Sequence, residues 1–300
     1  MKLSLNSPNA KYSRGDNIFM VFNYAFLVLI SIICFYPMYY VLAASLSSNH
    51  LLMQHSGLLL APRGFSYAAY ERVINNPMIL IGYKNTMFIL IVGVALSILM
   101  SSIGAYFLSR KNVLFKKPIM MGIVFTMFFS GGMIPTFLNL RDLGLLNSHW
   151  GLILPGMIST YNMIIMRTSF MSIPESLTEA AYIDGAGHVQ ILFRIILPLS
   201  KAILAVMVLF YGIGIWNSWF WASVILRNRE LFPLQVILRE ILLQHSVLDM
   251  TVGAGVGDQQ AISETIKYAT IIVATVPVLC IYPFLQKHFA RGVLIGGVKE

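Results

Sequence analysis

Six long stretches almost free of charged side chains divide this chain, and they limit what it can fold into. Each contains an apolar run of about 20 residues or more, the length that an α-helix needs to cross a bilayer core. Only 11% of the 300 residues are charged, whereas a soluble domain usually carries about a quarter. We therefore expect an all-α integral membrane protein with six transmembrane helices, at residues 18–44, 85–109, 118–140, 149–170, 202–226 and 268–287.

The first apolar stretch follows a polar lead at residues 1–16. It is longer than the apolar core of a secretory signal, which has about 7–15 residues. Ala43-Ala44-Ser45 is similar to a signal cleavage site, so a removed signal is the alternative to a retained span. We favour the retained span, and a six-helix transmembrane domain over residues 17–289, followed by a tail at 290–300. Within the third run, Gly131-Gly132 predicts a break or kink.

Basic side chains are distributed unevenly over the two sides that six spans create. The side with both termini holds 13 of the 21 Lys and Arg residues and five of the 12 acidic ones, which gives a net charge of +8 there against +1 opposite. Positive charge concentrates in cytoplasmic loops. We expect cytoplasmic N and C termini, a cytoplasmic loop at 171–200, and external loops at 46–82 and 227–267.

The cytoplasmic loop has the sequence pattern of a helical hairpin. Ser172 followed by Glu175 fits a capping box, and Gly185 and Gly187 provide left-handed positions that end a helix. A second amphipathic stretch, residues 188–196, ends at Pro198.

On the first helix of this hairpin, Ala180, Ala181 and Asp184 share one side and Glu179 lies on the neighbouring side. Two alanines allow another protein to approach closely, and acids can meet basic groups. The pattern is equally compatible with a hairpin that docks on a partner and with a membrane-surface hairpin that packs on its own protein.

The chain lacks the motifs of a nucleotide hydrolase or of a common hydrolytic enzyme. There is no G-x-x-x-x-G-K-[ST], no H-E-x-x-H and no G-x-S-x-G. We expect no catalytic residue, no metal site and no cofactor bound by this chain. We attribute the pI of about 9.6 to membrane topology rather than to nucleic-acid binding. The uncharged runs hold no ionisable group of the kind that proton- or sodium-coupled carriers usually need. The energy for transport should therefore come from outside the chain.

Aromatic–amide pairs mark a candidate path for substrate. They are Trp216, Asn217 and Trp219 in the fifth span, and Tyr161 and Asn162 in the fourth. Aromatic faces beside an amide can stack on and hydrogen-bond to a sugar ring. An interfacial aromatic belt and helix packing are the alternatives. On a single helix, Trp216 and Trp219 would lie about 60° apart.

The hairpin resembles the EAA loop of ABC-importer permease subunits. Glu-Ala-Ala at 179–181 is followed by three residues, Gly185, nine residues and then Ile195-x-Leu197-Pro198. Three further passages, residues 137–148, 215–219 and 284–299, resemble carbohydrate-uptake permeases of the maltose-transporter type, closest to the oligosaccharide branch. The chain ends at Glu300, where tails of that family often end in Lys-Gly.

The resemblance implies the fold of a type I ABC importer permease in the bacterial cytoplasmic (inner) membrane, crossing it several times. It implies a second homologous permease subunit, two ATP-binding subunits that hold ATP and Mg²⁺, and an extracytoplasmic solute-binding protein. The EAA loop would enter a cleft on the ATPase and drive alternating access for a sugar or oligosaccharide. The coupling residues carried over are Glu179, Ala180, Ala181, Asp184, Gly185, Gly187, Arg194, Ile195, Leu197 and Pro198.

Two other functions are compatible with the spans. One is an ABC permease for a peptide, a phosphonate or glycerol phosphate, and the other is a secondary carrier.

Overall fold

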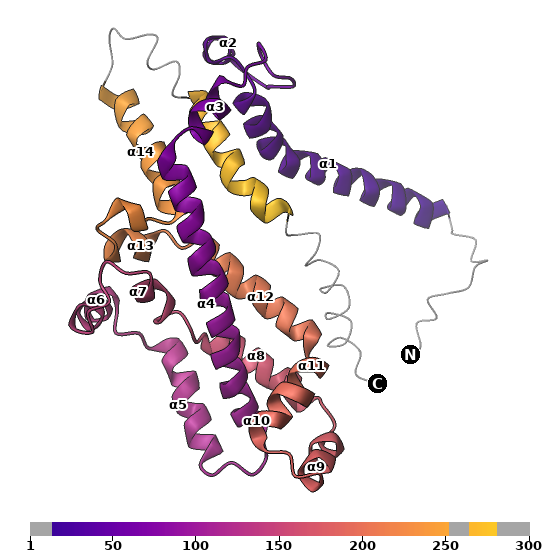
Figure 1. The fold of residues 1–300 in the computed structure, drawn as a ribbon. Helices are drawn as coiled ribbons and strands as arrows, with labels where there is room; N and C mark the ends of the chain where they lie inside the picture. The colour runs from indigo at the N-terminus through magenta and orange to yellow at the C-terminus, as the bar shows by residue number, and fades with distance from the viewer. Residues whose placement is uncertain (1–13, 252–263, 281–300) are drawn as a thin grey trace. The chain divides into compact units, whose positions relative to one another are not determined.

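The computed structural model describes residues 14–251 and 264–280, and these residues form helices and connecting loops without a β-strand (Figure 1). Within these ranges the chain forms two compact units, residues 14–71 with 264–272 and residues 72–251 with 273–280. The expected tail at 290–300 lies outside the described residues, as does most of the lead.

The smaller unit is built around α1, Arg14–Ser45. Most side chains of α1 are exposed, and Ile18 and Phe22 have exposed fractions of 71% and 69%. An exposed apolar helix surface of this kind suits contact with lipid. Its C-terminal end packs differently, because Ala43 and Ala44 form a small core with Leu52 of α2, Asn49–Met53, and with Leu59.

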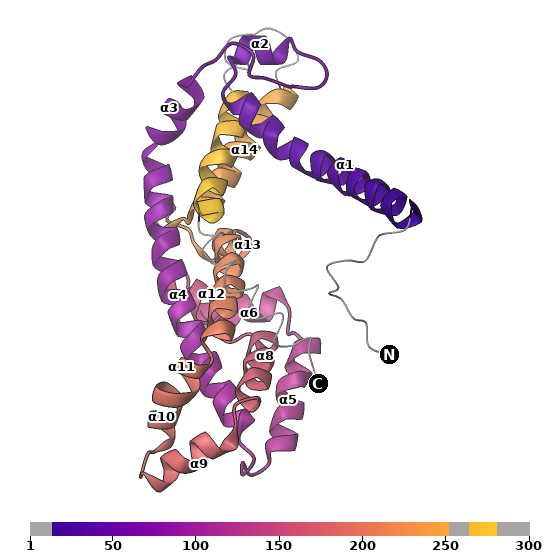
Figure 2. The same cartoon turned by 90° about the vertical axis from the view of Figure 1, so that its right-hand side faces the viewer.

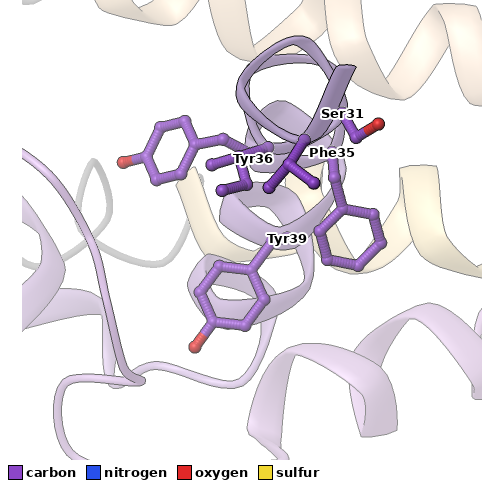
Figure 3. A pocket seen from close by; sticks show the side chains of 6 residues that line it. Ser31, Phe35, Tyr36 and Tyr39 are labelled. Carbon is purple, nitrogen blue, oxygen red and sulfur yellow. The ribbon is translucent and has the colours of Figure 1, made fainter. Parts of the chain in front are cut away.

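A shallow apolar hollow follows the same helix, and Figure 3 shows its side chains projecting from α1 alone. Tyr36 accepts a hydrogen bond from the Leu59 amide at 3.0 Å, and Tyr39 donates one to the Leu60 carbonyl at 2.7 Å. Both hydroxyl groups therefore hold the following loop, and we assign the hollow to the fold rather than to a binding site. Its lining is Val28, Ser31, Ile32, Phe35, Tyr36 and Tyr39.

The larger unit is organised along α4, Pro77–Ser109, which begins at an Asn76 cap that accepts a hydrogen bond from the Met78 amide at 3.0 Å. In both views α14 lies beside one end of α4, and α9 and α10 lie at the other end (Figures 1 and 2). The buried face of α4 is rich in small residues, which allow membrane helices to approach closely. They include Gly82, Thr86, Gly93, Ser97 and Ser101.

The other helices are short or interrupted. They are α3, Ala68–Ile74; α5, Lys116–Phe128; α6, Met133–Asp142; α7, Trp150–Ile153; α8, Thr160–Met171; α9, Glu175–Ile183; α10, His188–Ile191; a π-helix, Leu192–Ile196; α11, Leu197–Leu199; α12, Lys201–Trp216; α13, Phe220–Ile225; a 3₁₀ turn, Arg229–Leu231; α14, Leu234–Thr251; and a last helix over 264–280.

Within the described residues, two helices are long and apolar enough to cross a bilayer, Gly15–Ser45 and Pro77–Ser109. The predicted break at Gly131-Gly132 is confirmed, because α5 and α6 meet there at 111° and Gly132 has φ +86°. A second bend, of 87°, separates residues 188–199 from α12. The count of six spans therefore stays a prediction, since several expected spans consist of two shorter helices.

The start of α14 is fixed to α4 by close packing and hydrogen bonds. The Leu234 amide donates to Thr86 Oγ1 at 2.8 Å, and Asn85 Nδ2 donates to the Phe232 carbonyl at 3.0 Å. A Cβ added to Gly82 would lie 3.0 Å from Leu234 Cα and 2.6 Å from Ile237 Cδ1. The backbone contact leaves no room for a side chain.

Gly82→Val should lower the melting temperature of the detergent-solubilised chain, because overpacking of this kind costs about 1–3 kcal/mol. Gly122→Val is the control, since nothing lies within 4 Å of a Cβ added there. Melting of Gly82→Val at the wild-type temperature would contradict this packing.

Candidate functional site

The predicted hairpin forms as α9, a tight turn and α10. Gly185 has φ +79°, and the Ala186 amide donates to the Ala181 carbonyl at 2.9 Å, which closes the end of α9. The left-handed position predicted for Gly185 is confirmed. The same prediction for Gly187 is wrong, because Gly187 has φ −76° and ψ 166° and serves as the N-cap of α10. One left-handed residue is enough to end α9, and the next glycine begins the following helix.

The predicted capping box is also wrong. Ser172 has φ −80° and ψ −10° at the end of α8, and its hydroxyl donates to the Ser169 carbonyl at 2.7 Å. Pro174 is the N-cap of α9. Glu175 is thus free of a capping role, and its carboxylate forms an ion pair with Lys111 in the loop after α4.

The second arm of the hairpin does not end at Pro198 but continues to Leu199 through the π-helix. Proline has no N–H to donate and collides with the carbonyl four residues earlier. Here that carbonyl belongs to Arg194, inside the wider π turn, which relieves the collision without ending the helix.

One side of the hairpin packs into the chain's own core. Ala181 is 8% exposed, and Ile191, Leu192 and Ile196 are buried more completely. They join a hydrophobic cluster with Tyr106 and Leu108 of α4, Met163, Met166 and Phe170 of α8, and Met207 and Tyr211 of α12. The hairpin is therefore continuous with the helical core, and Ala181 is a core residue rather than part of an open face.

The other side of the hairpin is exposed. Of the predicted coupling residues, Ile195 and Leu197 are half-buried, and the exposed ones are Glu179, Ala180, Asp184, Gly185, Gly187, Arg194 and Pro198. Sequence reasoning missed two large apolar side chains at the tip, Ile183 and Val189, which are 87% and 70% exposed. Their signal was an apolar residue on each side of the Asp184–Gly187 turn. Exposed apolar groups beside acids suit a protein–protein contact.

Polar contacts fix the hairpin to α4. His188 Nδ1 lies 2.9 Å from the Tyr182 hydroxyl and 3.3 Å from the Tyr106 hydroxyl. An unprotonated Nδ1 has one lone pair, so it can accept a hydrogen bond from one of these two tyrosine O–H groups, and the roles depend on the tautomer. The Arg110 guanidinium lies 4.4 Å from the centre of the Tyr106 ring. His188 thus links α9, α10 and the end of α4.

Two basic side chains reinforce the same junction. Arg167 Nε donates to the Leu108 carbonyl at 3.0 Å. The hydrogen bond and the charge of Glu175 raise the pKa of Lys111 above its ordinary value. The Lys111 ammonium is therefore charged at neutral pH, and the contribution of the ion pair is lost as pH rises through the Lys111 pKa. Both partners are exposed, so salt should weaken it.

The candidate path residues lie in different environments. Helix α12 ends at Trp216, so the 60° relation between Trp216 and Trp219 on one helix is wrong. Trp216 is 6% exposed and Asn162 7%, whereas Tyr161 is 57% exposed. Asn217 is exposed and Trp219 is half-buried. Within the described residues, no hydrogen bond or ring contact joins Tyr161 or Asn162 to the group of Trp216, Asn217 and Trp219.

In the part of the chain that the structure describes, no three His, Cys, Asp or Glu side chains are placed to hold a metal ion. The hairpin thus presents an exposed tip on a base that is buried in the helical core.

Tyr182→Phe removes the hydroxyl closest to His188 and should loosen the hairpin. We expect amide hydrogen exchange across residues 183–191 to rise roughly twofold to fivefold, as loss of about 0.5–1 kcal/mol from one partly exposed hydrogen bond predicts. Val189→Ala changes an exposed tip residue and should leave exchange unchanged. Equal exchange in Tyr182→Phe and wild type would contradict the link.

The chain is similar to known proteins along nearly its whole length. The family model described as "Binding-protein-dependent transport system inner membrane component" matches residues 5–295. The polygalacturonan/rhamnogalacturonan transport system permease protein YtcP of Bacillus subtilis (strain 168) is 42% identical over 287 residues, which cover 95% of this chain and 99% of that protein.

Two solved structures are similar. A chain of a bacterial ABC transporter involved in the import of the acidic polysaccharide alginate is 36% identical, with a TM-score of 0.83 over 93% of this chain and 99% of that one. A chain of a bacterial alginate ABC transporter, solved with an alginate pentasaccharide-bound periplasmic protein, shares the fold at 17% identity and a TM-score of 0.53, over 91% and 94% of the two chains. The chain belongs to the family of inner-membrane components of binding-protein-dependent transport systems, and it is a transport subunit rather than an enzyme.

Proposed function

We propose that this chain is a permease subunit of an ATP-driven importer that moves a sugar or oligosaccharide across the cytoplasmic membrane. The observation that carries the proposal is the hairpin of α9 and α10, whose exposed tip stands on a base that is part of the helical core. The permease for polygalacturonan and rhamnogalacturonan and the importer for alginate, which is an acidic polysaccharide, support a substrate of the same class.

An importer of this kind requires partner proteins that supply energy and deliver the substrate. We propose a second homologous permease, two ATP-binding subunits that hold ATP and Mg²⁺, and an extracytoplasmic solute-binding protein. A periplasmic protein bound to the similar alginate transporter supports the last of these. In this proposal the hairpin tip docks in the ATPase, with Glu179, Asp184 and Arg194 giving charge complementarity and Ala180 and Gly185 allowing close approach.

We propose the six-span topology with both termini in the cytoplasm and residues 171–200 as the cytoplasmic coupling loop. Helices α1 and α4 each supply one span, and the interrupted helices supply the others. This places the hairpin inside, and it places residues 46–82 and 227–267 outside, where a solute-binding protein can reach them.

Transport then follows from alternating access. Closure of the ATPase dimer on ATP moves the hairpin, and the packing of Ile191, Leu192 and Ile196 carries that motion into α4, α8 and α12. The two states differ in their affinity for ATP and for the loaded binding protein, so each ligand biases the same equilibrium.

Gly185→Leu should uncouple ATP hydrolysis from transport. Position 185 is exposed and has φ +79°, so a leucine adds bulk at the proposed contact as well as about 1–2 kcal/mol of backbone strain. Gly144→Leu is the matched control, because Gly144 has φ +68° and open space around it but lies outside the hairpin. We expect only Gly185→Leu to lose co-purifying ATPase subunits and sugar-stimulated ATP hydrolysis.

If Gly185→Leu kept both its co-purifying ATPase subunits and sugar-stimulated ATP hydrolysis at wild-type levels, the coupling role would be contradicted. The sugar class is tested on the wild-type complex, reconstituted with its solute-binding protein. Stimulation of ATP hydrolysis by oligosaccharides supports the proposal, and stimulation by a peptide or phosphonate alone would overturn it.

A further inference from the structure

The fifth expected span is broken where the aromatic residues lie. Helix α12 ends at Trp216 and α13 begins at Phe220, so Asn217, Ser218 and Trp219 connect two helices. Asn217 and Ser218 are exposed. Irregular backbone at membrane depth is tolerated only where it is buried in protein or lines a water-filled cavity. In the proposed topology, this exposed break therefore faces an aqueous path rather than lipid.

A cation lies on the same break. The Arg239 guanidinium, from α14, is 3.4 Å from the centre of the Trp219 ring. The Arg239 side chain is exposed, and within the described residues it forms no ion pair. Nearby Arg229 differs, because it is paired with Glu240 at 2.6 Å. In the proposed topology α14 belongs to the external segment at residues 227–267, so this exposed guanidinium lies on the outer, aqueous side of the break.

The stacking also changes what Trp219 can do. Arg239 covers one face of its ring, and Phe220 meets the ring edge-to-face with 5.6 Å between centroids. The covered face cannot stack on a sugar ring, as the sequence suggested for Trp219. The ring instead lies against the guanidinium and limits where its N–H groups can point.

We infer that Trp219 and Arg239, with the Asn217–Ser218 break beside them, form a subsite for the carboxylate of a uronate unit in an acidic oligosaccharide. This inference rests on the proposed function and names its substrate class. A guanidinium held by a ring presents a planar fork of donors that matches a carboxylate. Asn217 Nδ2 donates to the Ile213 carbonyl at 3.0 Å, so its Oδ1 is the atom that can accept from a sugar hydroxyl.

The test uses the complete complex, reconstituted in proteoliposomes with its own solute-binding protein. Uptake of trigalacturonate is compared among wild type and three variants, Arg239→Lys, Arg239→Gln and Arg239→Glu. The same binding protein serves every variant, so differences between variants arise in the permease. Arg229→Gln is the matched control, because it removes a nearby arginine that is already paired. Arabinotriose and maltotriose are the neutral probes.

We expect kcat/KM for trigalacturonate uptake to fall as the positive charge of the side chain at position 239 is removed or reversed. Arg239→Gln should lower it roughly tenfold, the size expected for loss of a charge-assisted contact. Arg239→Glu should lower it further. Arg239→Lys should lower it less than Arg239→Gln does, because lysine keeps the charge but lacks the planar fork of donors. Arg229→Gln should stay within about twofold of wild type. Uptake of any neutral trisaccharide that the complex accepts should change little in all four variants.

Three results would overturn the subsite. The first is an equal loss in Arg239→Lys and Arg239→Gln, which is the result of a purely structural stack. The second is an equal loss for acidic and neutral sugars, which is the result of a contact with a partner protein. The third is a wild-type complex that transports neutral trisaccharides and not trigalacturonate, in which case the proposed importer function stands. A complex stimulated by no sugar contradicts the proposed function itself.

Discussion

The architecture depends on one packing interaction, the burial of the hairpin's inner side against α4, α8 and α12. Ala181, Ile191, Leu192 and Ile196 leave water for a cluster that also contains Tyr106 and Phe170. A loop attached only at its two ends could change shape when a partner protein displaces it, without moving the helices. A hairpin whose side chains pack between those of α4, α8 and α12 should move together with them, since packed cores resist continuous deformation.

The polar contacts at the same junction give this packing a defined orientation. His188 connects α9 and α10 to α4, and the Lys111–Glu175 pair joins the start of α9 to the loop after α4. At the other end of α4, Gly82 and Thr86 receive the start of α14. The helix that carries the hairpin is thus also the helix that positions α14, which holds Arg239. One element connects the proposed point of energy input with the proposed substrate path.

Much of this could be predicted from sequence, and the misses have physical causes. Charge-free runs gave the helical membrane class, and the spacing from Glu179 to Pro198 gave the hairpin. The error at Gly187 arose because one left-handed residue already ends α9, and the error at Ser172 because that residue still belongs to α8. The break after Trp216 could not be predicted, because no proline lies at that point of the sequence. The stack of Arg239 on Trp219 could not be predicted either, because the two residues are 20 positions apart in sequence.

The most direct test of the central claim is the location and partner of the hairpin tip in the intact complex. A single cysteine is placed at position 179 by Glu179→Cys in a chain whose Cys34 and Cys280 are replaced by serine, and membranes of known orientation are treated with an impermeant thiol reagent and a short cross-linker. The account predicts labelling only from the cytoplasmic side and cross-linking to the ATP-binding subunit. Labelling from the outside, or no cross-link in an active complex, would contradict it.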